Sequence, residues 1–249
     1  MKPKQEICIE AINLKTRKLN GYKLLTVYSK EYGVLKLTGS KLGGRSEPFV
    51  HNHFYISFGK EDIHKIIQTE FIGYFSKLNL NLERMAHAWQ YSDFLEACSE
   101  AQDERSPQIF DLLFNSLSSL QKTEDQFENI SLQFLWQLSV LLGYKPNLGL
   151  CNLGQQCHLN QKLNQENWPN AFFDLEAGGV LCSACPEEPI TAESIKILPN
   201  VYKALLLLEK GQISDNAKLN QFLLGLLQRY LQKHTCQKLK SLKVFSQLL

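Results

Sequence analysis

Four cysteines occur in two pairs that could bind a metal ion. Cys182 and Cys185 form a Cys-x-x-Cys motif, and Cys151 and Cys157 form a wider pair earlier in the chain. Two such pairs from separate loops can complete a tetrahedral Zn²⁺ site. Four thiolate ligands leave no coordination position for a substrate, so we expect a structural zinc rather than a catalytic one. Two disulfides, or thiols without a metal, are the alternatives.

A second group of residues with binding chemistry is basic and lies near the N-terminus. Residues 1–45 carry ten Lys and Arg against three Glu, a net charge of +7, whereas residues 46–140 have a net charge of −8. This segregation produces a local positive field although the whole chain carries only +2. Seven residues are the expected DNA contacts, with a solvated surface as the alternative: Lys15, Arg17, Lys18, Lys23, Lys36, Lys41 and Arg45.

The segment that must position these basic residues has the pattern of short strands. We expect strands near 7–12 and over Tyr22–Tyr28, Gly33–Thr38, Phe49–Phe58 and Ile63–Ile72. Five short strands in this space fit a small OB-type β-barrel, with an SH3-like barrel as the alternative.

Two basic connections separate these strands. The segment Lys15–Gly21 is expected to form a turn-forming loop, and Gly39–Arg45 a flexible loop whose glycines give a phosphate access to the backbone. OB barrels bind single strands across one face and through their loops by neutralising phosphates and stacking bases. Tyr22, Tyr28 and Tyr32 are candidates for stacking, and packing within the barrel is the alternative.

Beyond Tyr74 the apolar period becomes helical. Expected helical segments cover 78–95, Gln108–Leu120, Phe127–Leu142, Val201–Leu208 and Leu219–Leu231, with helical periodicity resuming at Thr191. Gly143, followed by Pro146, is expected to end the third of these helices.

The chain is therefore expected to be an α+β protein in three parts. Residues 1–75 form the OB-type barrel, residues 76–143 and 190–249 form an α-helical domain, and residues 144–189 form an inserted zinc-binding module. The module has few periodic apolar residues, so metal binding would help it to fold.

Several functional classes are disfavoured by what the sequence lacks. It has no apolar run long enough to cross a bilayer, no signal-peptide core, no Walker loop and no dinucleotide or nucleophile-elbow motif. Isolated cysteines among apolar residues fit a reducing compartment. We therefore expect a cytoplasmic protein that is not an enzyme and does not contact a membrane.

Several motifs, in this order along the chain, resemble the bacterial recombination mediator RecO family. They are Gly21–Lys36, Leu141–Pro146 followed by Cys151, the segment Glu176–Cys185, and the ending Arg229–Lys243. Two features differ from the family pattern. Five residues separate Cys151 from Cys157 instead of two, and Leu42-Gly43-Gly44 replaces a stretch that is often rich in Arg and Lys.

The resemblance implies a function in DNA repair and homologous recombination. Members of the family bind single- and double-stranded DNA, anneal complementary strands, and help to load recombinase together with RecR in the RecF pathway. They also bind the acidic tail of single-strand DNA-binding protein. The resemblance thus implies a nucleoid-associated protein of the cytoplasm with structural Zn²⁺. A zinc-containing nucleic-acid-processing enzyme and a protein-binding adaptor are the alternatives.

Overall fold

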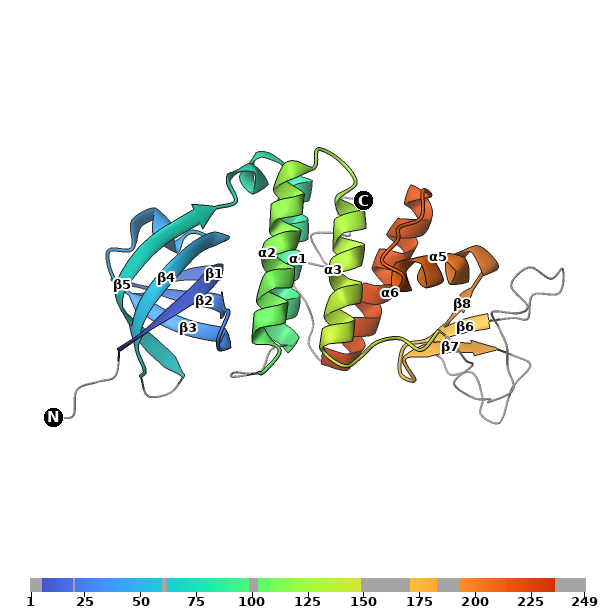
Figure 1. The fold of residues 1–249 in the computed structure, drawn as a ribbon, viewed down its shortest axis with the longest axis horizontal. Coiled ribbons are helices and arrows are strands. Elements are labelled where there is room, and N and C mark those ends of the chain that lie inside the picture. The colour runs from blue at the N-terminus through green and yellow to red at the C-terminus, as the bar shows by residue number, and fades with distance from the viewer. Residues whose placement is uncertain are drawn as a thin grey trace. The chain divides into compact units, whose positions relative to one another are not determined.

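The structure is a computed structural model, and it describes residues 6–19, 21–59, 62–98, 103–148, 171–182 and 193–235. The described residues form two compact units, one ending at Phe127 and the other beginning at Glu128. Strands predominate at the start of the first unit and helices in the rest of the chain (Figure 1). The expected α+β class is confirmed.

Five strands in the first unit form a sheet that closes on itself. They are β1 (Glu6–Leu19), β2 (Tyr22–Ser29), β3 (Gly33–Gly39), β4 (Val50–Ser57) and β5 (Ile63–Tyr74). The strand order is β1-β2-β3-β5-β4, and β4 pairs back to β1 to complete a barrel. All neighbours are antiparallel except β3 and β5, which pair in parallel over a short stretch. The prediction of five N-terminal strands is confirmed.

The barrel interior is filled by alternating apolar side chains, as the period of a strand requires. Leu25 and Val27 of β2, Leu37 of β3, and Phe54 and Ile56 of β4 are all fully buried there. The residues between them face outward or toward the helices. The same alternation that predicted these strands therefore builds the core.

The expected loop over Lys15–Gly21 is wrong for most of its length. The first strand continues to Leu19, which pairs with Tyr22, so only two residues of the chain separate β1 from β2. Gly21, just before β2, has a φ of 85°, which glycine adopts without steric cost. The basic residues of this segment therefore lie on a strand, because cross-strand pairing with β2 outweighs their polar character.

Strand β5 contains two β-bulges opposite β4. Ile66 pairs with Ile56 and Gln68 pairs with Tyr55, which leaves Ile67 as an extra residue. Phe71 and Gly73 pair with consecutive residues of β4 in the same way, so Ile72 is the second extra residue. Both bulged isoleucines are exposed, at 46% and 42%. A bulge bends its strand and redirects the side chains that follow.

Helical elements complete the first unit: the 3₁₀ turns η1 (Gly43–Ser46) and η2 (Ser76–Leu80), and the helices α1 (Leu82–Cys98) and α2 (Ser106–Lys122). Aromatic pairs join them to the barrel. Phe49 packs edge-on against Trp89 at 5.3 Å, and Phe75 packs against Phe114 at 5.6 Å between ring centroids. Such pairs bury large apolar areas, so α1 and α2 are part of the same compact unit as the barrel.

In its described residues, the second unit combines three helices with a small sheet. Its elements are α3 (Phe127–Leu141), β6 (Ala171–Asp174), β7 (Gly179–Cys182), β8 (Ser194–Ile197), α5 (Pro199–Glu209) and α6 (Ala217–Thr235). The sheet is antiparallel, in the order β7-β6-β8. The prediction that helical structure resumes at Thr191 is wrong for Ser194–Ile197. These residues form a strand that pairs with β6, and the helix begins only at Pro199.

The predicted stop after the third helix is confirmed. Gly143 has a φ of 83°, and its N–H donates to the Val140 carbonyl at 3.1 Å. The Tyr144 N–H donates to the Ser139 carbonyl at 2.8 Å. This pair of hydrogen bonds is the Schellman arrangement that glycine favours at a helix end.

The predicted division into residues 1–75, 76–143 with 190–249, and 144–189 stays a prediction. The two compact units divide the chain differently, since α1 and α2 belong with the barrel strands. None of the helices in the described residues is both long and apolar enough to span a membrane.

Candidate nucleic-acid interface

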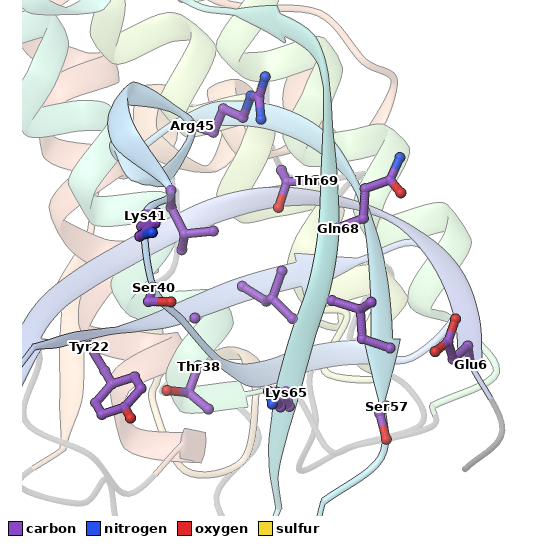
Figure 2. Close-up of a pocket in the computed structure, with 14 residues that line it drawn as sticks. Glu6, Tyr22, Thr38, Ser40, Lys41, Arg45, Ser57, Lys65, Gln68 and Thr69 are labelled. Carbon is purple, nitrogen blue, oxygen red and sulfur yellow. The ribbon is translucent and has the colours of Figure 1, made fainter. Parts of the chain in front are cut away.

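A groove opens on the barrel where β3 and β5 separate. The parallel pairing of these strands ends at Thr38 and Lys65, and beyond this point the segment after β3 turns away into η1. The resulting cavity has a volume of about 960 Å³. Figure 2 shows Tyr22, Ser40 and Lys41 on one side of β5 and Ser57 with Glu6 on the other.

Three cationic side chains from separate segments line this groove. Lys41 comes from the connection after β3, Arg45 from η1, and Lys65 from β5. All three are exposed, and no ion pair joins them to a carboxylate in the described residues. Their charges are therefore available to an anionic ligand. Glu6 supplies the only carboxylate among the described residues that line the groove.

Buried amides of the barrel hold the segment that carries Arg45. The Asn13 side chain donates to the carbonyl of Arg45 at 2.8 Å and to that of Glu47 at 2.9 Å. Asn52 donates to the same Arg45 carbonyl at 3.0 Å. Both asparagines are fully buried, where an amide is stabilising only when it is hydrogen-bonded. They fix the backbone beneath Arg45 and leave its guanidinium exposed.

Lys23 contributes to this support instead of lining the groove. Its ammonium group donates to the Gly43 carbonyl at 3.2 Å and to the Ser46 hydroxyl at 2.5 Å. The Ser46 hydroxyl in turn donates to the Gly43 carbonyl at 2.7 Å. Lys23, a predicted DNA contact, thus positions η1. The sequence analysis missed Asn13 and Asn52, since a buried amide in a strand has no signature of its own.

Lys41 has an unusual backbone conformation for a residue with a side chain. Its φ of 58° lies in the left-handed region, where residues with a Cβ are uncommon. Positions of this kind cost of order 1 kcal/mol and concentrate at functional sites. A glycine would fit here without strain, so the structure keeps a lysine at some cost to stability.

Lys65 is a groove residue that the sequence analysis missed. It pairs with Thr38 across the parallel β3–β5 contact, and both side chains line the groove. The contact joins strands that are separated by β4 in the sequence, so alternation within one strand could not reveal it. Knowledge of the strand order would have been enough to find it.

Lys15 does not line the groove and pairs with α1 instead. Its ammonium group is 2.6 Å from the Asp93 carboxylate and also contacts Glu96. Burial acts to lower the pKa of Lys15, but the hydrogen bonds that its ammonium group donates to both carboxylates, and their charges, outweigh burial, so the pKa lies above the usual lysine value. The structure thus gives this predicted DNA contact a structural ion pair.

The remaining predicted contacts are exposed but do not line the groove. Arg17 and Lys18 lie near the end of β1, and Lys36 lies on β3. Of the tyrosines, Tyr22 is 60% exposed and lines the groove, whereas Tyr28 is buried. Tyr32 packs against the barrel core and against Phe58, at 5.8 Å between ring centroids.

The cysteine motif lies mostly outside the described residues, which include Cys182 but not Cys151, Cys157 or Cys185. Cys182 is the last residue of β7, pairs with Ala171 of β6 and is buried.

Gly178, which comes just before β7 in the segment Glu176–Cys185, has a packing function. A Cβ at Gly178, whose φ is 69°, would lie 2.8 Å from the Tyr230 hydroxyl oxygen. Glycine therefore lets the β6–β7 turn approach α6.

Comparison with known proteins gives the family of the chain. The family model "Recombination protein O C terminal" matches residues 79–243, which is more than half of the chain. A protein of Pelotomaculum thermopropionicum named DNA repair protein RecO is 28% identical, over 93% of this chain and 90% of its own length. A protein of the same name from Exiguobacterium sibiricum is 25% identical, over 91% and 90% of the two chains.

A DNA repair protein RecO from a Synechococcus strain is 23% identical, over 96% of this chain and 88% of its own length. These relatives match the barrel as well as the helical residues, because the alignments cover nearly the whole chain. The resemblance seen in the sequence motifs is thus confirmed by an independent match. The chain belongs to the recombination protein O (RecO) family of DNA repair proteins.

Proposed function

We propose that this RecO-family protein binds single- and double-stranded DNA through its barrel, anneals complementary strands and catalyses no bond cleavage. The observation that carries the proposal is the convergence of Lys41, Arg45 and Lys65 on one groove. Three cations without a carboxylate partner in the described residues form a surface suited to phosphates.

The barrel topology supports the same conclusion. The strand order β1-β2-β3-β5-β4, with a parallel β3–β5 contact, is what we expect of an OB-type barrel. OB folds bind oligonucleotides through a strand face and adjoining loops. The groove is formed by β3, the connection that follows it, and β5, and so lies in a suitable region.

Annealing requires that strands be held without covering the base edges that must pair. Contacts to phosphates meet this requirement, since they carry little sequence information. Binding of this kind depends strongly on salt, with a slope of roughly 0.7 log units per phosphate neutralised on a single strand.

The test is a salt titration of oligonucleotide binding, followed by fluorescence anisotropy, together with a strand-annealing assay. The Lys41→Glu/Arg45→Glu variant is expected to bind roughly 100-fold more weakly, with a shallower salt slope and slower annealing. Lys77→Glu/Lys122→Glu is the matched control, because both lysines are exposed, belong to the same unit and lie outside the groove. Equal losses in the two variants, or a slope unchanged by the groove variant, would contradict the proposal.

We further propose structural Zn²⁺ on Cys151, Cys157, Cys182 and Cys185. Four thiols are a donor set that Zn²⁺ prefers, and Cys182 lies at a strand end just before its Cys-x-x-Cys partner. When bound, the metal would stabilise the fold and leave no open coordination position. Metal analysis should find about one zinc per chain, and Cys182→Ser should lower it while the barrel unit stays folded. Absence of zinc from the wild-type protein would refute this proposal.

Protein partners are the last part of the proposed function. Membership in the RecO family supports binding to RecR and to the acidic tail of single-strand DNA-binding protein, and such a DNA-bound protein would be associated with the nucleoid. A pull-down with RecR, and competition between labelled oligonucleotide and the acidic tail peptide, would test these partners. Peptide binding without any DNA binding would favour a protein-binding adaptor instead.

A further inference from the structure

The residues that line the groove include many polar and aliphatic side chains but few aromatic ones. Besides Lys41, Arg45 and Lys65, the lining offers hydroxyl groups and one side-chain amide, from Thr38, Ser40, Ser57, Thr69 and Gln68. Its apolar part is aliphatic: Leu42, Ile66 and Ile67. Tyr22 is the one aromatic side chain that the described residues contribute to it.

This lining suits a phosphate backbone better than it suits bases. Lys, Arg and hydroxyl groups are the usual donors to phosphate oxygens. Bases bound without sequence preference are instead held by stacking on aromatic side chains. Phe58, Phe71 and Tyr74 are exposed aromatic residues of the same barrel, but none of them lines the groove.

Backbone conformation adds an independent indication. Gly39, the last residue of β3, lines the groove, and the exposed Gly43 and Gly44 begin η1 shortly after Lys41. Within this segment Lys41 keeps a left-handed conformation that glycine would adopt more easily. The residue that keeps this strained conformation adds a positive charge to the groove lining, and a site for base stacking would not need that charge.

The groove also limits the size of what it holds. Its volume of about 960 Å³ is near the upper end of the range of roughly 300–1,000 Å³ found for small-ligand pockets. It therefore accommodates a short stretch of one strand. Glu6 and Ser57 line it on the other side of β5 from Lys41 (Figure 2).

We propose that the groove holds the sugar–phosphate backbone of a single strand and directs the bases outward, where a complementary strand can pair with them. This inference rests on the proposed DNA binding and specifies which part of the nucleotide the groove recognises. Lys41, Arg45 and Lys65 contact successive phosphates, and Tyr22 makes no contribution that depends on a base.

The first test compares three oligonucleotides of equal length with the wild-type protein. They are oligothymidylate, an abasic chain with the same charged backbone, and oligothymidylate with a neutral methylphosphonate backbone. We expect the abasic chain to bind within about threefold of oligothymidylate, and the neutral chain at least tenfold more weakly. Abasic binding as weak as that of the neutral chain would overturn the inference while leaving DNA binding intact. Failure of all three to bind would refute the proposed function itself.

The second test assigns the effect to the groove. Lys65→Gln should weaken binding of the normal and the abasic chain by the same factor, about fivefold. Lys36→Gln, an exposed lysine of β3 outside the groove, is the matched control and should change either affinity less than twofold. Tyr22→Ser should also have less than a twofold effect. A loss with Tyr22→Ser that is confined to the normal chain would show stacked bases in the groove and overturn the inference.

Discussion

Two sides of the first unit carry basic residues of the same types but use them differently. On the groove side, Lys41, Arg45 and Lys65 have no ion pair in the described residues. On the side that faces the helices, Lys15 pairs with Asp93 of α1. Lys30 lies there too, 3.6 Å from Glu10 and over the ring of Phe110. A lysine in a basic segment is therefore either available to a ligand or engaged in the fold, according to what packs opposite it.

The largest expected effect is that of a Lys15 substitution on stability, and DNA binding should be nearly unchanged by it. Lys15→Met should lower the free energy of unfolding by about 2 kcal/mol, because it leaves the nearly buried Asp93 carboxylate without its cation. DNA affinity should change less than threefold. Urea unfolding and anisotropy measure the two quantities. Since the folded pKa of Lys15 is raised, its contribution should be present at neutral pH and lost only as the pH rises through that folded value. A large loss of affinity in a stable variant would place Lys15 among the DNA contacts.

A substitution at Lys41 should change the same two quantities in opposite directions. Lys41→Gly relieves the left-handed backbone and should raise the free energy of unfolding by up to about 1 kcal/mol. It also removes a groove cation, so affinity for a single strand should fall about fivefold. Lys36→Gly is the control, because glycine in an ordinary strand should destabilise the barrel with little effect on affinity. A destabilised Lys41→Gly variant would contradict the argument from strain.

Acidification should affect the helix-facing side through His51. This buried imidazole lies 2.9 Å from Glu10 and contacts the rings of Phe110 and Phe114. Burial lowers its pKa, and nearby His53 and Lys30 act in the same direction, whereas Glu10 opposes them. A lowered pKa means that the neutral form is stabilising, so stability should fall as the pH drops below the usual histidine value.

Chemical unfolding at pH 7 and pH 5 measures the total pH dependence, to which His87 also contributes because burial lowers its pKa to about 3. The part of this dependence that His51→Gln removes should be smaller than the effect of Lys15→Met. His51→Gln should reduce the dependence on pH, and the neighbouring His53→Gln should leave it in place. An unchanged pH dependence in His51→Gln would show that another group is responsible.

The smallest expected effect concerns the groove's carboxylate. Glu6→Gln should raise affinity for a single strand about twofold at low salt, because it removes a repulsion from phosphates. The gain should vanish in high salt, where exposed charges are screened. Weaker binding by Glu6→Gln at low salt would mean that this part of the groove is not used by DNA.

Much of the fold could be predicted from the sequence because it follows local periodicity. The strand expected at Gly33–Thr38 is observed at Gly33–Gly39, and the third helix matches to one residue. The strand β8 was missed, since four residues show no clear period and their pairing with β6 depends on a distant segment. Local pattern thus predicts an element when the element is long enough to show its period.

The groove residues were harder to predict from the sequence than the fold, because tertiary contacts determine which basic residues line the groove. Lys41 and Arg45 were predicted and do line the groove, whereas Lys65 depends on the parallel pairing of β3 with β5. Lys15 could be separated from them only by knowing that Asp93 of α1 lies opposite. Whether each groove residue contacts DNA stays a prediction.

The bulge at Ile67 has a consequence for any change in the length of β5. Ile66 and Thr69 are both buried although they stand three positions apart, because the inserted residue shifts the alternation by one. Removing Ile67 would delete this extra residue and leave Gln68 opposite Tyr55 and Thr69 opposite Phe54, as they are now, so the Thr69 side chain would stay inside. A single codon deletion there would accordingly remove the local bend of β5 while keeping its pairing with β4.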